Sequence, residues 1–294
     1  MNNVIEEVNG WIPDELVNKI ICGDCVDLMA DLLPDNCIDL TVTSPPYDNI
    51  RSYEDHIQYF DFEAIADQLC RVTAKGGVIV WVVGDQTKDG TESGTSFSQA
   101  LHFKKLGMLL HDTMIYKRGC PYPPNVRYWQ EFEYMFILSK GPPKTFNPLM
   151  QPKKESIEQR RVRSSSSFNS HNRGRDGELK PLDSRAIARI QNAASETSRI
   201  RSNIWEFQQG GGKSSKDKIA YEHPAIFPEQ LAHDHILSWS NPGDLCFDPM
   251  CGSGTVAKQS KLLKRNYLGF DVVQTYVDLA NRRLDATQAP LMVM

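Results

Sequence analysis

The first notable absence in this sequence of 294 residues is that of a long hydrophobic run. The longest uninterrupted apolar segment, Val78 to Val83, has the length of a strand, whereas a helix that spans a bilayer needs about 20 apolar residues. The segment from Met1 to Glu7 also lacks the basic start and apolar centre of a secretory signal. These absences predict a cytoplasmic protein that has no association with a membrane.

A surplus of positive charge is absent as well, because the formal net charge is −4. A surface covered uniformly with basic residues is therefore excluded. The cysteines form no complete metal motif: Cys22 and Cys25 make a single C-x-x-C, and neither a second one nor a paired-histidine motif accompanies it. We expect reduced thiols and no bound metal.

The net charge conceals an uneven distribution along the chain. Residues 145–203 contain twelve Lys or Arg and six Asp or Glu, which gives this segment about +6 and the rest of the chain about −10. Large apolar residues are few in the segment, so it cannot build much of a core. We predict a discontinuous domain of residues 1–144 and 204–294 and a basic insertion of residues 145–203. A solvated linker is the alternative interpretation of the insertion.

Outside the insertion, strand-like and helix-like segments alternate. The pattern predicts strands at 19–22, 38–42, 78–83, 245–247 and 267–270, and helices at 26–33, 62–72, 231–239, 255–263 and 275–284. A turn is expected at Gly76-Gly77. Such alternation predicts an α/β fold whose largely parallel sheet is covered by helices on both faces.

A glycine-rich turn joins a predicted strand to a predicted helix in the segment from Asp248 to Thr255. Gly252 and Gly254 allow a ligand to approach the backbone, and the helix N-terminus supplies free amide groups. Asp271 ends the next strand, where a carboxylate can bind the ribose hydroxyls of a nucleoside. An acid directly before the turn favours a cationic ligand such as S-adenosylmethionine over the pyrophosphate of a dinucleotide, which is the alternative.

A second motif, Ser44-Pro45-Pro46-Tyr47, follows the predicted strand 38–42. Ligands of parallel sheets bind at the carboxyl ends of the strands. The two prolines impose an extended backbone without N–H donors, so that its carbonyl groups can accept hydrogen bonds from a ligand. By itself the motif is also compatible with an ordinary turn.

Together, the two motifs resemble those of the DNA amino-methyltransferases of the circularly permuted beta class. In that class an S/D-P-P-Y motif comes first, the target-recognition region second and the glycine motif of the cofactor site third, which is the order found here. The resemblance covers most of the chain outside residues 145–203. It implies a Rossmann-like, S-adenosylmethionine-dependent methyltransferase fold with an inserted target-recognition region. Met250 and Cys251 depart from the more common Phe and Ala but leave the glycines intact.

The resemblance also implies roles for individual residues. Ser44, Pro45, Pro46 and Tyr47 would form the catalytic motif. The segment Gly23-Asp24-Cys25 would lie near the adenine of the cofactor, the segment from His223 to Pro228 near its methionine end, and Asp271 at its ribose. The cofactor-binding residues would be Asp24, Cys25, Thr43, His223, Phe227, Pro228, Asp248, Pro249, Met250, Gly252, Ser253, Gly254, Thr255 and Asp271.

The catalytic motif suits the methylation of an exocyclic amine, whose lone pair is delocalised into the base. The Ser44 hydroxyl and the Pro45 carbonyl would accept its N–H bonds and favour a tetrahedral nitrogen, while Tyr47 would stack on the flipped base. In the family, Ser at the first position accompanies cytosine N4 methylation more often than adenine N6 methylation. We therefore predict a cytosine-N4 enzyme, with adenine N6 as the alternative. Methylation of cytosine C5 is not expected, because the chain contains no Pro-Cys step to supply the nucleophile.

The basic insertion is expected to contact double-stranded DNA, with phosphate contacts from Arg160, Arg161, Arg163, Arg173 and Arg175. The resemblance implies a prokaryotic or phage-encoded protein, and a cognate restriction endonuclease and a second copy of the chain are candidate partners. An RNA methyltransferase and a non-catalytic DNA-binding protein remain alternatives, although the sequence contains no recognised RNA-binding module.

Overall fold

The computed structural model describes residues 10–46, 60–119, 127–128, 130–153, 172–173, 179–180, 197–207 and 214–288. The chain divides into two compact units, one of residues 1–147 with 203–294 and the other of residues 148–202. In the smaller unit, β8 (Met150–Pro152) pairs antiparallel with β11 (Ser198–Ile200), and β9 (Asn172–Arg173) pairs antiparallel with β10 (Leu179–Lys180).

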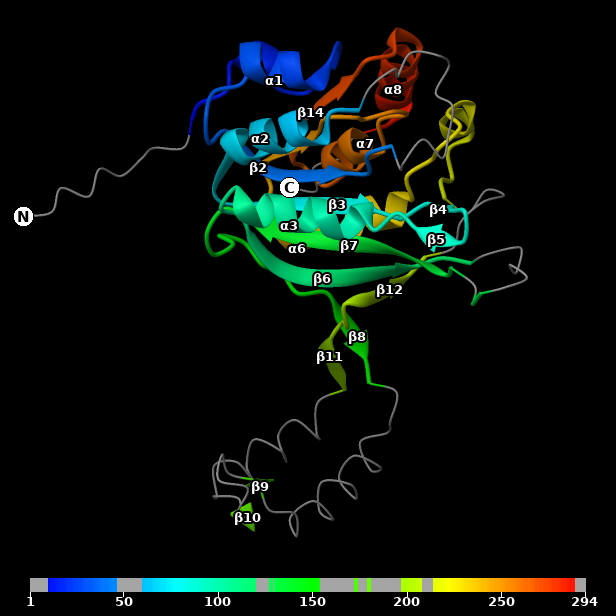
Figure 1. The fold of residues 1–294 in the computed structure, drawn as a ribbon. Helices are drawn as coiled ribbons and strands as arrows, with labels where there is room; N and C mark the ends of the chain where they lie inside the picture. The colour runs from blue at the N-terminus through cyan, green and yellow to red at the C-terminus, as the bar shows by residue number, and fades with distance from the viewer. Residues whose placement is uncertain are drawn as a thin grey trace, which may run out of the picture. The chain divides into compact units, whose positions relative to one another are not determined.

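An eight-stranded mixed sheet forms the centre of the larger unit (Figure 1), in the order β1-β14-β13-β2-β3-β7-β6-β12. The strands are β1 (Lys19–Cys22), β2 (Ile38–Thr43), β3 (Thr73–Val83), β6 (Leu109–Lys117), β7 (Phe132–Ser139), β12 (Ile204–Glu206), β13 (Leu245–Asp248) and β14 (Asn266–Asp271). Neighbouring strands are parallel except where β7 pairs with β3 and β6. The predicted largely parallel sheet is therefore confirmed. A short hairpin of β4 (Thr87–Lys88) and β5 (Thr91–Glu92) stands apart from it in hydrogen bonding.

Among the described residues, three helices pack on each face of this sheet (Figure 1). One layer consists of α1 (Cys25–Leu32), α2 (Phe62–Val72) and α3 (Thr95–Lys105). The other consists of α6 (Glu229–Trp239), α7 (Thr255–Leu262) and α8 (Gln274–Ala286). The described part of the larger unit also contains two short 3-10 helices, η1 (Asp14–Leu16) and η2 (Lys218–Glu222). The arrangement is the expected Rossmann-like one.

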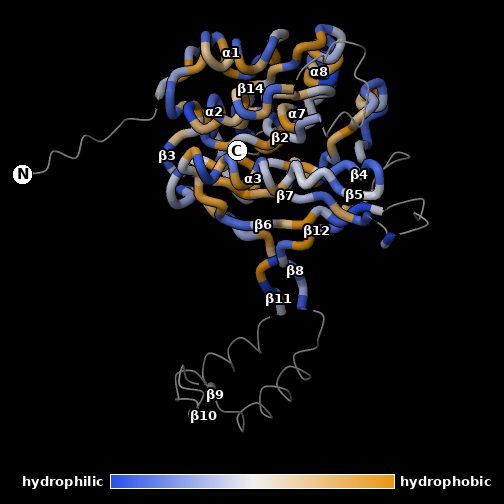
Figure 2. Tube along the Cα trace, viewed as in Figure 1, coloured by the Kyte–Doolittle hydropathy of each residue, from blue (hydrophilic) through white to orange (hydrophobic). Residues whose placement is uncertain are grey.

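The sequence pattern explains these layers. In α2, the buried Ile65, Leu69 and Val72 recur at helical spacing, and the Asp61 carboxylate caps the helix by accepting the Ala64 N–H at 3.0 Å. Strand β2 is buried on both faces, as is typical of a parallel strand between two helix layers. Figure 2 shows hydrophobic and hydrophilic residues interleaved along α1 and α2, which therefore present one face to the sheet and the other to solvent.

The turn predicted at Gly76-Gly77 was wrong, because β3 continues through both glycines. A change of register between Ile38 and Leu40 of β2 marks an irregularity in the β2–β3 pairing here. Gly76 has a φ of +71°, and a Cβ on Gly77 would lie 2.8 Å from the Ala74 carbonyl oxygen. The glycines thus permit a local distortion inside a strand rather than a chain reversal.

No helix within the described residues is long and apolar enough to cross a membrane.

Candidate active site

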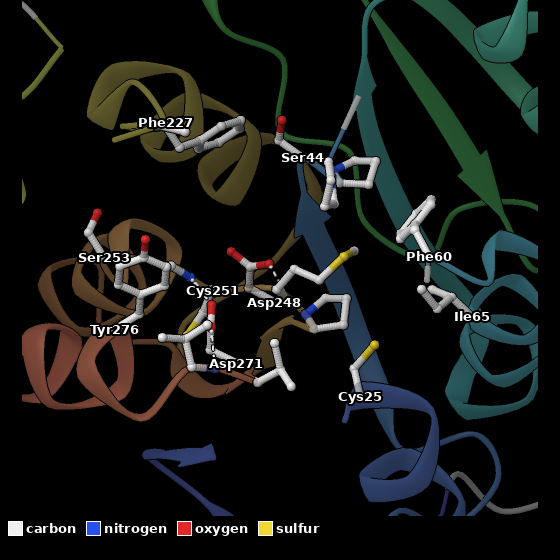
Figure 3. A pocket seen from close by; sticks show the side chains of 18 of the residues that line it. Cys25, Ser44, Phe60, Ile65, Phe227, Asp248, Cys251, Ser253, Asp271 and Tyr276 are labelled. Atoms are coloured by element: carbon white, nitrogen blue, oxygen red, sulfur yellow. Dashed lines mark hydrogen bonds between the residues drawn. The ribbon is translucent and has the colours of Figure 1, made fainter. Parts of the chain in front are cut away.

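A cavity of about 530 Å³ lies at the carboxyl ends of the parallel strands. Its floor is formed where four neighbouring strands end: Asp24 follows β1, Asp271 ends β14, Asp248 ends β13 and Ser44 follows β2. In Figure 3, Asp248 lies between Ser44 and Asp271, as the strand order requires. This edge of the sheet is where ligands of open α/β folds bind.

Asp248 is the most deeply buried acid of the cavity, with 6% of the residue exposed. Its Oδ1 accepts hydrogen bonds from the Thr43 hydroxyl at 2.8 Å and from the Met250 amide at 3.2 Å. Burial, with a smaller contribution from the charge of Asp271, raises the pKa of Asp248 to about 7 despite the lowering effect of these two hydrogen bonds. Ionising this carboxyl group in the folded protein therefore costs stability.

The glycine turn is closed by Asp271. Its Oδ2 accepts the Gly252 amide at 2.8 Å and its Oδ1 accepts the Val273 amide at 3.0 Å, while burial raises its pKa. Gly252 has a φ of +48°, and a Cβ there would lie 2.9 Å from Nε2 of His223. Gly254, with a φ of +73°, begins α7 and lies so close to α8 that a Cβ would approach that of Ala280 to 2.7 Å. Both positions therefore require glycine.

The segment from His223 to Pro228 forms one wall of the cavity. The Ala225 amide donates to Nδ1 of His223 at 3.1 Å, and the imidazole packs edge-on against the Tyr276 ring with the centroids 4.3 Å apart. His223 is buried, and Phe227 and Pro228 line the cavity beside it. His223 thus supports the wall and the glycine turn by packing.

A buried ionic cluster contacts the glycine turn. Arg283 of α8 is fully buried, and its guanidinium donates to the Ser253 hydroxyl at 3.0 Å and to the Thr255 hydroxyl at 3.2 Å, as well as to the Ser253 carbonyl. It also donates to Asp217 at 2.8 Å and to Glu229 at 2.9 Å.

Lys258 completes this cluster and balances its charge. Its ammonium lies 3.3 Å from Asp217 and 2.7 Å from Glu229. Burial raises the pKa of Asp217, but the hydrogen bond and charge of Arg283 and the charge of Lys258 outweigh it and hold that pKa below its usual value. The cluster connects the glycine turn to the segment that precedes His223, because Arg283 binds both Ser253 and Asp217.

The charges that line the cavity are mostly negative. Its carboxylates are Asp24, Asp27, Asp61, Glu133, Asp248 and Asp271, and Arg118 is the only Arg or Lys among the described lining residues. A ligand with phosphate groups would be repelled by the acids near the glycine turn, whereas a cationic nucleoside fits them.

Comparisons with known proteins identify the family. The family profile of the DNA methylases (N6_N4_Mtase) matches residues 38–282. The orphan methyltransferase M.BamHII of Bacillus amyloliquefaciens is 50% identical over 257 residues, which cover 87% of this chain and 92% of that protein. The chain belongs to the DNA methylase family.

More distant relatives are also DNA methyltransferases. The type II methyltransferase M.BglII of Bacillus subtilis is 28% identical over 280 residues, covering 91% of the methylase described here and 69% of that protein. The solved structure of the cytosine-N4-specific PvuII DNA methyltransferase has a TM-score of 0.60 at 17% identity, with 92% and 93% of the two chains covered. TTHA0409 of Thermus thermophilus, solved with S-adenosyl-L-methionine, has a TM-score of 0.57 at 20% identity, with 93% and 95% covered. At these identities the solved structures support the fold alone.

The cavity of the methylase brings most of the predicted site residues together. Fifteen of them line it: Asp24, Cys25, Ser44, Pro45, Pro46, His223, Phe227, Pro228, Asp248, Pro249, Met250, Gly252, Ser253, Thr255 and Asp271. Thr43 and Gly254 are not among the lining residues; Thr43 lies behind Asp248 as its hydrogen-bond donor, and Gly254 packs against α8.

Six predicted site residues have no described side chain. Tyr47, Arg160, Arg161, Arg163 and Arg175 lie outside the described residues. Arg173 is described only through its backbone in β9.

Several lining residues were not predicted from the sequence. Phe60, Asp61, Ala64 and Ile65 come from the start of α2, and Tyr116, Arg118 and Glu133 come from the ends of β6 and β7. One signal was present: Glu133 is an acid within the largely apolar strand Phe132–Ser139. A charge in such a strand indicates a functional or paired group.

The described residues contain no cluster of His, Cys, Asp or Glu that could hold a metal ion. Six of the seven cysteines lie in the described residues and are free thiols. Burial raises the pKa of Cys25 to about 12, so this cavity thiol remains protonated at neutral pH.

Proposed function

We propose that this DNA methylase transfers a methyl group from S-adenosylmethionine to the N4 amino group of a flipped-out cytosine in double-stranded DNA. The observation that carries the proposal is the shared cavity of Ser44-Pro45 and the glycine turn. The two motifs are distant in sequence, but the strands that present them, β2 and β13, are neighbours in the sheet.

Residues of the glycine turn would hold the cofactor. The carboxylates of Asp248 and Asp271 offer negative charge and hydrogen-bond acceptors to a cationic nucleoside, and Gly252 and Ser253 allow it to approach the backbone. When bound, S-adenosylmethionine supplies an electrophilic methyl group. The relative TTHA0409 was solved with this molecule, which supports the choice.

Ser44 and Pro45 would orient the base. Pro45 is buried and Ser44 is half-buried at the end of β2, so the Ser44 hydroxyl and the Pro45 carbonyl are positioned by the sheet. Accepting the two N–H bonds of the amine makes its lone pair available on the nitrogen. Tyr47 would stack on the base and offset part of the cost of flipping it.

Serine at position 44 favours cytosine N4 as the acceptor, and the name of the PvuII relative supports this choice. The order of motifs along the chain supports the permuted beta class. We further propose that residues 145–203 contact the DNA, with Arg160, Arg161, Arg163, Arg173 and Arg175 at its phosphates. A cognate restriction endonuclease and a homodimer are predictions that co-purification and sedimentation would test.

Mass spectrometry of nucleosides tests the reaction and the base together. The purified methylase is incubated with unmethylated DNA and S-adenosylmethionine, and the DNA is digested. We expect N4-methylcytosine. Formation of N6-methyladenine would support methyl transfer to DNA but would show that adenine is the target base. The absence of any methylated nucleoside would refute the proposal.

The variant Ser44→Ala tests the role of the motif. Loss of one positioned hydrogen-bonding group is expected to lower kcat on the order of 100-fold, with the Kd for S-adenosylmethionine unchanged. Ser98→Ala is the control, because Ser98 is an exposed residue of α3 that bonds only to its own helix, at Thr95, among described residues. A fully active Ser44→Ala variant would contradict the mechanism.

A further inference from the structure

The only Arg or Lys among the described cavity residues lies away from the glycine turn. Arg118 directly follows β6, and Glu133 is the second residue of β7. In the sheet, β7 and β6 lie on the opposite side of β2 from β13 and β14. The pair therefore faces the cavity from across Ser44, where the amine acceptor would enter.

Glu133 forms an ion pair with Arg118 inside the cavity. Nε of Arg118 lies 3.3 Å from Oε1 of Glu133, whose side chain is only 10% exposed, against 34% for that of Arg118. The backbone of Arg118 is held as well, since its amide donates to the Glu131 carbonyl at 2.7 Å. A guanidinium has five N–H donors in a rigid planar fork, and within the described residues the buried Nε of Arg118 forms no hydrogen bond, so that its contact with Glu133 is an ion pair alone.

The end of the cavity at Arg118 differs in charge from the end at Asp248 and Asp271. A cation beside Asp248 and Asp271 would compete with a cationic cofactor, whereas Arg118 lies beside Glu133 on the other side of Ser44 from these two acids. The ring edge of cytosine next to N4 presents two neighbouring acceptors, N3 and O2. Adenine presents one acceptor, N1, next to N6, and then a C–H group.

We propose that Arg118, positioned by Glu133, is a specificity-determining residue that donates to N3 and O2 of the flipped cytosine. The inference rests on the proposed cytosine-N4 function and names the residue that selects the base. Adenine would leave one donor of the fork unpaired, and a site built to hydrogen-bond a substrate rejects analogues that lack the acceptor.

Two variants test whether Arg118 recognises the base or only neutralises the charge of Glu133. Arg118→Met with Glu133→Gln removes both charges of the ion pair together. Arg118→Lys keeps the positive charge but loses the planar fork. Arg127→Met is the matched control, because Arg127 bonds to Thr87 and Gly90 of the β4–β5 hairpin and does not line the cavity.

The substrates are two duplexes that carry the methylated site, once mapped by sequencing, with either cytosine or adenine at the target position. For each protein, kcat/KM is measured on both duplexes. The Kd for S-adenosylmethionine and the thermal midpoint Tm report whether the fold and the cofactor end are retained.

We expect the double variant and Arg118→Lys to lose about 10- to 100-fold of the preference for cytosine, mainly through a lower kcat/KM on the cytosine duplex. The Kd for S-adenosylmethionine and the preference of Arg127→Met stay at the wild-type values. An unchanged preference in the double variant would overturn the proposal. An equal loss on both duplexes would also overturn it, because a phosphate contact weakens both alike.

The wild-type product distinguishes the two levels of failure. If wild-type protein makes N4-methylcytosine and the double variant keeps its preference, the role of Arg118 alone is refuted. If wild-type protein makes only N6-methyladenine, the proposed base is refuted and the inference with it.

Discussion

Replacing Asp248 by asparagine is expected to stabilise the protein at neutral and alkaline pH and to weaken its binding of a cationic ligand. Asparagine has the same shape, and its Oδ1 can still accept the hydrogen bonds from Thr43 and Met250. The charge is lost, and with it the free-energy cost of holding a buried carboxylate. The variant therefore separates what Asp248 does for the fold from what it does for the site.

The magnitude follows from the pKa of Asp248, which burial raises from 3.8 to about 7. Between these two pH values the native carboxyl holds a proton that the unfolded chain has lost, so the stability of the wild type falls as the pH rises. Above pH 7 the carboxyl group is ionised in both states, and the full loss of stability is present. A shift of about three pKa units corresponds to about 4 kcal/mol. The asparagine variant carries no such cost at any pH.

Urea unfolding of both proteins from pH 4 to 8 measures this difference. We expect the variant to gain stability relative to the wild type as the pH rises from 4 to 7, by up to about 4 kcal/mol, and the gap to stay constant above pH 7. A stability difference that is the same at pH 4 and pH 8 would refute the reasoning. The variant Thr43→Val is informative beside it, because loss of the hydrogen bond that lowers the pKa should move the midpoint to higher pH.

Ligand binding should show the opposite pH dependence. At pH 8 the wild-type carboxylate is charged, and its loss is expected to raise the Kd for S-adenosylmethionine about 10-fold or more. Below pH 6 the wild-type group is protonated, so the two proteins should converge. Calorimetric titration at both pH values tests this, and a Kd ratio independent of pH would contradict it.

Three further predictions concern other parts of the chain. Arg283→Gln breaks the buried ionic cluster and should cost about 3 to 5 kcal/mol in urea unfolding and weaken cofactor binding, whereas Arg265→Gln, which removes a buried Arg bonded to Ser240, should lower stability without changing the Kd. Gly254→Ala should lower stability by about 1 to 3 kcal/mol, visible as a lower Tm, because its Cβ would lie 2.7 Å from that of Ala280 at a φ of +73°. Replacing Arg160, Arg161 and Arg163 together by alanine should reduce the slope of log K for DNA against log salt by up to about 3 in filter binding, and an unchanged slope would remove these residues from the phosphate contacts.

Much of the fold and half of the cavity could be predicted because their signals are local. Ser44, Asp248 and Asp271 each stand where an apolar run ends, and strand–helix alternation places such ends on one edge of a parallel sheet. The strand 38–42 and the glycine turn before α7 needed only a few consecutive residues to be recognised. Such features are fixed by neighbours along the chain.

The other half of the cavity depends on pairing between distant segments. Strand β7 runs antiparallel between β3 and β6, so it presents its start, with Glu133, at the edge where its neighbours end. The direction of a strand is not encoded in its own apolar pattern. The ionic cluster is equally non-local, because Arg283 meets Asp217 and Glu229 from 66 and 54 positions away. No spacing rule connects such residues before the fold is known.

The bond between Thr43 and Asp248 shows why the order of the motifs along the chain matters little for the site. The two residues are 205 positions apart, yet the Thr43 hydroxyl donates to the Asp248 carboxylate at 2.8 Å across neighbouring strands. Ser44 is the next residue after Thr43, so this hydrogen bond connects the Asp248 carboxylate to the start of the motif proposed to hold the amine. The half of the cavity proposed for the cofactor and the half proposed for the base are thus joined by a contact within the sheet, and any chain order that keeps β2 beside β13 preserves it.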